Sequence, residues 1–387
     1  MDKDELRAWL RLSMTEGIGN DAARRLLSCF GSPQAVFEQT EAALGQIVTP
    51  QQAQALLSVP NELAVQCVRT HQWLMHQPDT HSHALWTLGD ARYPCELLQL
   101  ADPPLMIYVA GQTARALGNA IAIVGSRNPT PQGAQTAAQF GEALSAAGLC
   151  VVSGLALGVD GAAHQGALRG GKARDGASTC TQHWHTVGVV GTGLDRVYPR
   201  QHQTLAGQMA LQGLLISEYH LGTAPLAHHF PKRNRIIAAL GLGTLVVEAA
   251  LKSGSLITAK MALELNREVL AIPGSIHATQ SHGCHALIRQ GAKLVENAHD
   301  VLEELQLAPQ QQVNLFADAL NDGEATDASD NEHPLLTHMA FAPVSLDALQ
   351  ARCGLDTSSL QAQLLTLELD GAVGRLPGGL FQRLASA

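Results

Sequence analysis

Between Ile121 and Ala271 the chain repeats one pattern: a short apolar run, a turn that often contains glycine, and a stretch that suits a helix. Strands that alternate with helices form a parallel sheet covered on both faces, so the pattern predicts a doubly wound α/β fold. Ligands of such sheets bind at the carboxyl ends of the strands. The turns should therefore meet along one rim. The expected strands are Ile121–Val124, Cys150–Val152, Val187–Val190, Leu214–Ile216, Leu245–Val247 and Val269–Ala271.

Two of the turns have the composition of a phosphate cradle. Gly125-Ser126-Arg127 follows the first run, and Ser153-Gly154 follows the second, with Asp160 shortly after it. Glycine lets backbone N–H groups approach a phosphate, and the helix that follows adds its dipole. The spacing is neither G-x-G-x-x-G nor G-x-x-x-x-G-K-[ST], which excludes the ordinary dinucleotide fingerprint and the NTPase P-loop.

The segment from Phe230 to Glu248, FPKRNRIIAALGLGTLVVE, concentrates positive charge. It places Lys232, Arg233 and Arg235 around Asn234, just before a helix expected near Arg235–Leu240. A cationic cluster at such a place indicates a bound anion, and the guanidinium fork of arginine fits phosphate oxygens.

The composition limits where nucleic acid could bind. The 387 residues carry a formal net charge of −9, and 4% of them are aromatic. A nucleic-acid site on such a chain must be a local basic patch with few stacking residues. Seven cysteines are scattered without a C-x-x-C pair, which is typical of reduced thiols in a cytoplasmic protein. No apolar run reaches membrane-spanning length, so we expect a soluble protein without a membrane contact.

The chain divides into four parts by composition. Residues 1–80 form a helical region whose lack of basic excess predicts packing rather than DNA contact. Residues 81–307 hold the α/β domain, with an irregular surface insertion expected from Gly170 to Thr186. Residues 308–333 are expected to form a flexible linker. Residues 334–387 suit three short helices and a hairpin, in which the third helix, about Thr357–Asp370, lacks Lys and Arg and should contact protein rather than read DNA.

Six segments occur in one order over about the middle half of the chain: GSRNPTPQG, SGLALGVDGAAHQGAL, GTGLDRVYP, SEYHLGTAPLAHHFPKRNRIIAAL, VVEAALKSGSLITAKMALELNREVLAIPG and GCHALIRQGAKLV. This series resembles the DprA/Smf family, the DNA-processing proteins of bacterial transformation. The resemblance implies an extended Rossmann-like domain that binds and protects single-stranded DNA, forms a homodimer and helps to load the RecA recombinase, with single-strand-binding protein as a further candidate partner. It also implies a SAM-like or helix-hairpin-helix-like N-terminal domain and a winged-helix-like C-terminal domain, without a cofactor or an enzymatic activity.

Together, the motifs and the resemblance predict a site for DNA phosphates and bases. Arg127, Arg233 and Arg235 should hold phosphates with backbone amides at Gly125, Ser126, Gly154 and Gly193. Phe230 is expected either to stack on a base or to pack in the core. Asp160 and Glu248 are expected to orient the arginine cluster, without a catalytic role. The full predicted set is Gly125, Ser126, Arg127, Ser153, Gly154, Gly191, Gly193, Phe230, Lys232, Arg233, Asn234, Arg235, Ser253 and Ser255.

A dimer interface, shared with RecA, is expected in the segment Cys284–Leu305. Leu294 and Val295 suit an edge strand, which invites pairing with a second copy. The predicted contact residues are His285, Ile288 and Leu294, while Val301 and Leu302 are expected in the core. The cluster His277, His282, Cys284 and His285 fits no standard zinc spacing, so no metal site is predicted.

Two other functions remain open from the residues. Gly243-Thr244 followed by Glu248 partly matches LOG-type nucleoside-monophosphate phosphoribohydrolases. Their P-G-G-x-G-T-x-x-E loop is absent, because Ala239-Leu240-Gly241-Leu242 occupies its place. A sensor of a small phosphorylated ligand is the second alternative.

Overall fold

The computed structural model describes residues 1–78, 80–177, 182–307, 333–339, 341, 343–376 and 378–384, with the side chains of 176 and 177 left out. The predicted linker, 308–333, falls outside the described residues except for His333. Within the described ranges, no helix is both long and apolar enough to cross a membrane.

The described strands of the central domain form one sheet in the order β1-β2-β6-β5-β4-β3-β7-β8-β9. Strands β3 to β9 run parallel, while β1 and β2 pair antiparallel at one edge. From β3 the chain builds outward to β6, and then returns to place β7 on the other side of β3. This confirms the doubly wound α/β fold. The strands are β1 Ser82–Thr87, β2 Met106–Gly111, β3 Ala120–Val124, β4 Cys150–Ser153, β5 Thr186–Val189, β6 Leu214–Ser217, β7 Gly243–Val246, β8 Glu268–Ala271 and β9 Lys293–Leu294.

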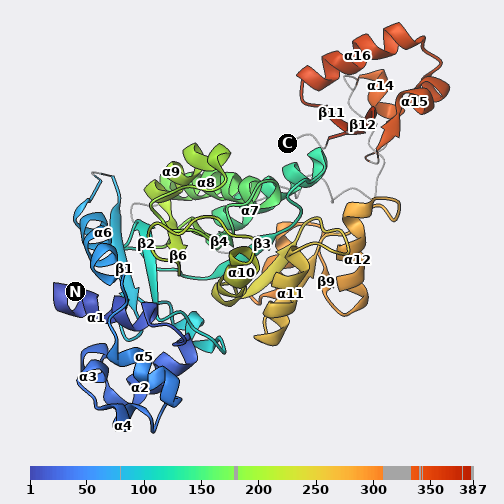
Figure 1. The fold of residues 1–387 in the computed structure, drawn as a ribbon. Helices are drawn as coiled ribbons and strands as arrows, with labels where there is room; N and C mark the ends of the chain where they lie inside the picture. The colour runs from blue at the N-terminus through green and yellow to red at the C-terminus, as the bar shows by residue number, and fades with distance from the viewer. Residues whose placement is uncertain are drawn as a thin grey trace.

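Helices cover both faces of the sheet (Figure 1). Alternate residues of β3 point to opposite faces: Ile121 and Ile123 pack with one layer of helices, and Ala122 and Val124 with the other. The first layer holds α7 Pro131–Ala146, α8 Val159–Ala177, α9 Gln203–Gln212 and α13 Ala298–Glu304. The second layer holds α10 His229–Leu240, α11 Ser255–Glu264 and α12 His282–Arg289, with η3 Thr279–Ser281 before α12.

Helix α8 continues into the first part of the segment that was predicted to be an irregular insertion. It runs to Ala177, and beyond the undescribed residues Trp184 and His185 are buried. That prediction is therefore wrong for the described part. Glycine allows the helix to continue close to α7, because a Cβ at Gly170 would lie 2.0 Å from the carbonyl oxygen of Glu142.

The N-terminal helices have a core of their own, which includes Leu12 and Leu26. They also pack against the sheet, since Leu10 of α1 shares a cluster with Tyr108 of β2. The helical region is thus joined to the β1–β2 edge of the sheet. Its helices are α1 Lys3–Met14, α2 Asn20–Phe30, α3 Pro33–Phe37, α4 Glu41–Leu44, α5 Pro50–Leu57 and α6 Leu63–Met75, and η1 Cys95–Gln99 follows β1.

The C-terminal part forms a separate cluster of three short helices and a small antiparallel sheet of order β10-β12-β11. This arrangement agrees with the predicted winged helix. The third helix, α16, carries Glu368 and no Lys or Arg, as expected. The elements are α14 Pro334–Thr337, β10 Val344–Ser345, α15 Leu346–Cys353, α16 Thr357–Leu369, β11 Val373–Leu376 and β12 Leu380–Arg383.

Candidate functional site

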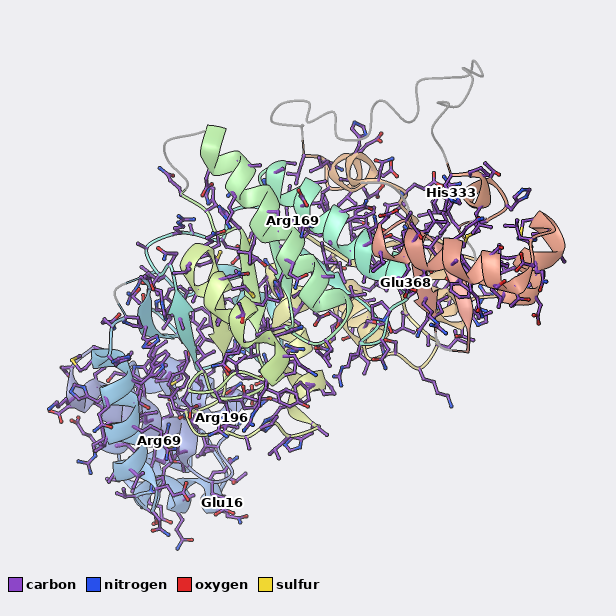
Figure 2. All side chains as sticks on the ribbon, turned by 90° about the horizontal axis from the view of Figure 1, so that it is seen from above. Glu16, Arg69, Arg169, Arg196, His333 and Glu368 are labelled. Atoms are coloured by element: carbon purple, nitrogen blue, oxygen red, sulfur yellow. The ribbon has the colours of Figure 1, made fainter. Side chains whose placement is uncertain are left out.

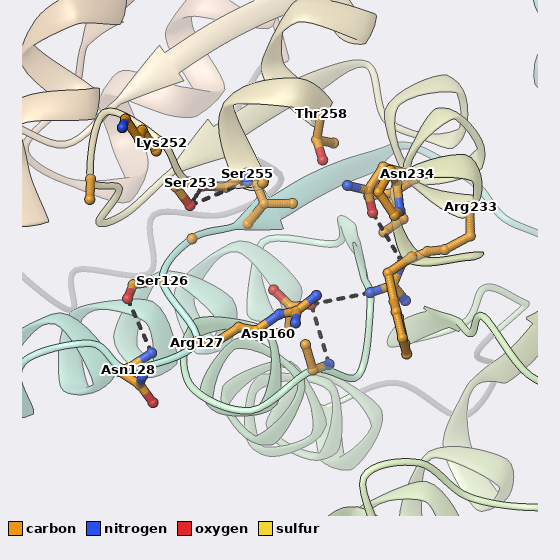
Figure 3. Close-up of a pocket in the computed structure, with 18 of the residues that line it drawn as sticks. Ser126, Arg127, Asn128, Asp160, Arg233, Asn234, Lys252, Ser253, Ser255 and Thr258 are labelled. Atoms are coloured by element: carbon orange, nitrogen blue, oxygen red, sulfur yellow. Dashed lines mark hydrogen bonds and ion pairs between the residues drawn. The ribbon is translucent and has the colours of Figure 1, made fainter. Parts of the chain in front are cut away.

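A cavity of about 510 Å³ opens where the strand order reverses, at the carboxyl ends of β3 and β7 (Figure 3). We call it the crevice. It lies between the turn after β3, the first turns of α10, and the loop that leads from β7 into α11. This is the place where doubly wound sheets bind their ligands. The predicted residues that line it are Gly125, Ser126, Arg127, Asp160, Phe230, Arg233, Asn234, Ser253 and Ser255.

The crevice is positive although the chain is acidic overall. Its lining contains Arg127, Arg233 and Lys252 against one carboxylate, Asp160. Arg127 and Lys252 are exposed, and neither forms an ion pair within the described residues. They come from the turns after β3 and β7, which are neighbouring strands. Both cations are therefore available to a bound anion.

Arg233 is buried and holds the ends of two strands together. Its guanidinium donates hydrogen bonds to the carbonyl oxygens of Gly154 and Val189, and it lies 3.9 Å from the carboxylate of Asp160. Burial lowers the pKa of Arg233 to about 10, against the opposing effect of Asp160. This guanidinium organises the rim from inside, and most of its donors are already committed to the protein.

The rest of the basic cluster is neutralised by the protein itself. Helix α10 begins at His229, so the cluster lies inside the helix, and the prediction that it precedes the helix is wrong. Arg235 donates to the buried carboxylate of Glu218 at 2.5 Å and lies 3.6 Å from Asp102. Lys232 lies 3.9 Å from the same carboxylate of Glu218 and is half-exposed. Neither residue lines the crevice.

The predicted backbone cradle is largely occupied by hydrogen bonds within the chain. The amide of Ser126 donates to the Glu248 carbonyl at 2.7 Å, that of Gly154 to the Asp160 carboxylate at 3.2 Å, and that of Gly193 to the Thr223 carbonyl at 3.2 Å. These amides cannot also hold a phosphate, which corrects the expectation for them.

Two further predicted residues lie away from the crevice lining. The hydroxyl of Ser153 donates to the carbonyl of Ile123 at 2.6 Å, and the carbonyl of Gly191 accepts from the ring of His229 at 3.1 Å. Both groups fix the strand ends, so the anion-binding capacity of the crevice comes from its side chains.

The loop between β7 and α11 brings polar groups to the opposite wall. The hydroxyls of Ser253 and Ser255 lie 2.7 Å apart, beside Lys252. Helix α11 starts here after Gly254, which supplies no side-chain cap. The positive end of its dipole adds to the charge of Lys252 at the crevice wall.

Phe230 stands half-exposed at the mouth of the crevice, in the first turn of α10. The guanidinium carbon of Arg127 lies 5.4 Å from the centre of its ring, within cation–π range. The ring is thus neither fully in the core nor free of the site. It joins an aromatic surface to the exposed cation.

The two predicted orienting carboxylates act at different places. Asp160 faces Arg233 and accepts from the amides of Gly154 and Ala156. Glu248 does not touch the arginine cluster: its carboxylate accepts from the amide and the hydroxyl of Thr130, at the start of α7. Burial raises the pKa of both carboxyl groups. The expected partner of Glu248 was therefore wrong.

Sequence reasoning missed part of the lining, of which Lys252 matters most. The sequence held a signal for this residue, because Lys252 directly precedes Ser253, which was itself a predicted binding residue. The other missed polar residues are Asn128, Thr258 and Gln280.

Comparison with known proteins identifies the family. Residues 84–306 match the model for DNA recombination-mediator protein A, which is more than half of the chain. The chain belongs to the DprA/Smf family. Residues 321–379 also match the DprA winged helix domain. The family resemblance that the sequence motifs suggested is confirmed.

The relatives are similar over long stretches. Protein Smf of Escherichia coli K12 is 36% identical over 98% of this chain and 96% of its own length. DNA processing protein DprA of Streptococcus pneumoniae is 43% identical over 57% of this chain and 74% of its own length. The crystal structure of the S. pneumoniae protein matches with a TM-score of 0.63, at 32% identity over 79% of this chain and 98% of the other.

A further DprA/Smf structure concerns DNA directly. It shows DNA processing protein A of Helicobacter pylori, with its single-stranded DNA binding mode. The match has a TM-score of 0.50, at 27% identity over 58% of this chain and 95% of the other.

Proposed function

We propose that this chain binds single-stranded DNA in the crevice and helps to load the RecA recombinase onto that strand. The observation that carries the proposal is the pair of exposed cations Arg127 and Lys252, which form no ion pair with any residue that the structure describes, beside the half-exposed ring of Phe230. Phosphates need cations, and unpaired bases need rings on which to stack. The single-stranded DNA binding mode of the H. pylori relative supports the same ligand.

The shape and the charge of the molecule favour a single strand over a duplex. A cavity of about 510 Å³ between two turns and a helix start accommodates a few nucleotide groups, not the width of a double helix. The element that reads duplex DNA in many winged-helix domains is the third helix, and α16 has no cation to offer to phosphates. The duplex is therefore the disfavoured ligand.

The proposal includes a homodimer whose interface lies at the β9 edge and is shared with RecA. Strand β9 ends the sheet, and Leu294 on it is 49% exposed. An edge strand with an exposed apolar side chain can pair with its own copy around a twofold axis. His285 and Ile288 lie on the neighbouring helix α12, where Ile288 also packs partly against the core. Leu294 is thus the better contact candidate of the three.

Binding of labelled single-stranded and duplex DNA, measured by fluorescence anisotropy over a range of salt, tests the proposal. We expect preference for the single strand and a loss of about tenfold or more in affinity for Arg127→Ala, since a charge-assisted hydrogen bond contributes about 1.5–3 kcal/mol. Lys260→Ala is the matched control, because Lys260 is exposed on the later part of α11 and pairs with Glu264. Equal binding by Arg127→Ala, Lys252→Ala and the control would remove the crevice as the DNA site. Release of free base from AMP by the pure chain would favour the phosphoribohydrolase alternative instead.

A further inference from the structure

A second aromatic ring stands beyond the mouth of the crevice. Tyr198 lies in the loop that follows β5, and the residue is 46% exposed. The centres of the Tyr198 and Phe230 rings are 5.6 Å apart, with the planes tilted by 38°. Tyr198 does not line the crevice, so the aromatic surface that begins at Phe230 extends outward over this loop.

Cations gather around the same loop. Arg196 and Arg200 flank Tyr198, and Arg200 is exposed and forms no ion pair within the described residues. Arg196 pairs with Asp195 at 3.4 Å, across an exposed surface where such a pair is weak. The loop therefore carries more positive than negative charge.

The N-terminal helices add an arginine to this place. Arg69 of α6 is exposed and donates to the carbonyl of Leu221 at 3.1 Å. The next residue, Gly222, donates its amide to Asp195 at 2.8 Å. Arg69 and Arg196 are thus connected through Leu221, Gly222 and Asp195. Figure 2 shows both arginines where the N-terminal helices meet the sheet. We call Arg69, Arg196 and Arg200 the outer patch.

The loop that carries Tyr198 and its two flanking arginines is held in place along its length. The ring of His229 donates to the carbonyl of Gly191, and the amide of Gly193 donates to that of Thr223. At the far end, the ring of His202 donates to the carbonyl of Leu155 at 3.0 Å. A loop with such anchors can present Tyr198 and its cations at fixed positions, as a binding surface requires.

We propose that single-stranded DNA leaving the crevice passes over Tyr198 and reaches the outer patch, so that the N-terminal helices contribute to DNA binding through Arg69. This inference rests on the proposed function. The strands β7, β3, β4 and β5 are consecutive in the sheet, and their spacing of about 4.8 Å places the tip of β5 about 14 Å from that of β7. A strand of DNA that crosses the rim in this direction meets cations, then rings, then cations.

This order of groups suits a single strand. Its phosphates follow the cations while its bases stack on the aromatic side chains, whatever their sequence. Arg127 already lies within 5.4 Å of the centre of the Phe230 ring, so Tyr198 offers the more open face of the pair. The outer patch therefore adds length to the site rather than a second, independent site.

The test compares oligonucleotides of about 4 and about 16 nucleotides, the range of site sizes found for single-strand-binding domains. We expect Tyr198→Ala to bind the long oligonucleotide about tenfold less tightly and the short one normally. Tyr198→Phe should behave as the unmodified chain. Arg200→Ala and Arg69→Ala should each lower the salt slope by about 0.7 for the long oligonucleotide alone. Arg169→Ala is the arginine control, because Arg169 lies on α8 and pairs with Glu142 at 2.6 Å.

Equal binding of the long oligonucleotide by Tyr198→Ala and the unmodified chain would overturn the outer patch. An equal loss for both lengths would also overturn it, because Tyr198 would then act on the crevice through Phe230. A different result bears on the proposed function: if Arg127→Ala bound both lengths normally, the crevice itself would not be the DNA site. Thermal unfolding of each variant confirms that the comparison is made between folded chains.

Discussion

Thr130 and Glu248 connect the start of helix α7 to the segment that follows β7. The hydroxyl of Thr130 donates to one carboxylate oxygen of Glu248 at 2.6 Å, and its amide donates to the other at 2.9 Å. Thr130 also caps helix α7, accepting from the amide of Gly133 at 3.0 Å. One carboxylate at the end of β7 therefore fixes the start of the helix that follows β3. The turn that carries Arg127 lies between the end of β3 and this helix start.

Removing this carboxylate should loosen the turn. Glu248→Ala leaves two donors of Thr130 without their acceptor, at a cost of about 2 kcal/mol in the free energy of unfolding. We expect DNA affinity to fall as well, because Arg127 loses its fixed position. Urea unfolding and anisotropy measure the two effects. Glu248→Gln keeps one acceptor, so its stability and its DNA affinity should lie between those of Glu248→Ala and those of the unmodified chain. A loss of binding without any loss of stability would contradict the positioning role.

Arg127 and Arg233 should respond differently to the same substitution. Arg233→Ala leaves the buried Asp160 without its cation, and we expect a loss of about 3–5 kcal/mol of unfolding free energy. Arg127→Ala removes an exposed side chain, and should leave stability within about 0.5 kcal/mol while it weakens DNA binding. Chemical denaturation of both variants decides this. If Arg233→Ala were as stable as the unmodified chain, the guanidinium would not hold the strand ends.

Lys252 should contribute to binding mainly through its charge. Lys252→Gln removes the cation but keeps a polar side chain only one atom shorter, so we expect weaker binding to every sequence and a salt slope lowered by about 0.7. Titrations at several salt concentrations measure the slope. An unchanged slope would place Lys252 outside the path of the phosphates, whatever its effect on affinity.

His220 should make the chain sensitive to acid. Its ring lies 3.3 Å from the hydroxyl of Ser13 and 3.2 Å from that of Tyr108, and burial lowers its pKa to about 4. The folded chain therefore binds this proton less tightly than the unfolded chain. The stability that the neutral ring contributes is full above about pH 6.5, and is lost as the pH falls toward about 4, by roughly 3 kcal/mol.

Comparison with His220→Asn isolates this contribution from those of other buried groups. The variant should be less stable at neutral pH, and its unfolding free energy should change less between about pH 6.5 and about pH 4. Parallel pH profiles of the two proteins would show that His220 does not titrate in this window.

The β9 edge can be tested with one exposed residue. Leu294→Glu places a charge on a half-exposed side chain of the edge strand, so we expect a folded monomer in place of a dimer. Loss of the dimer should also weaken binding to long DNA, because two linked sites act at high effective concentration. Sedimentation measures the mass. Ile288 is a poorer choice because it packs partly in the core, and a persistent Leu294→Glu dimer would place the interface elsewhere.

The parallel sheet and its rim could be predicted from the sequence, because the residues of each strand-turn-helix unit are consecutive in the chain. The alternation predicted where β3 and β7 lie in the sequence and that their turns share one rim, but it did not predict that the two strands are neighbours with the crevice between them. The start of α10 was also readable: Pro231 fits the first turn of a helix, where its missing N–H costs nothing. The sequence interpretation placed the helix start too late by ignoring this signal.

The partner of each charged side chain could not be predicted in the same way. Arg233 and Arg235 are two residues apart, yet Arg233 donates to carbonyl oxygens at the ends of two strands, and Arg235 donates to the carboxylate of Glu218. Those partners come from other strands and are brought close by the fold alone. The same holds for the amides of Ser126 and Gly193, whose acceptors lie on distant segments. Motifs locate a rim, but tertiary contacts decide which of its polar groups remain free.

Gly154 leaves the space that the guanidinium of Arg233 fills, since a Cβ there would lie 2.1 Å from one of its nitrogens. Phe230 is one helical turn before Arg233 on α10. Through Arg233, helix α10 is thus hydrogen-bonded to the ends of β4 and β5. The same helix carries the ring of Phe230 one turn earlier. A base held by Phe230 would have its position set by the sheet rather than by a loose surface loop. The main-chain carbonyl oxygens that hold Arg233, and not the DNA, would then determine the spacing between a base stacked on Phe230 and a phosphate bound in the crevice.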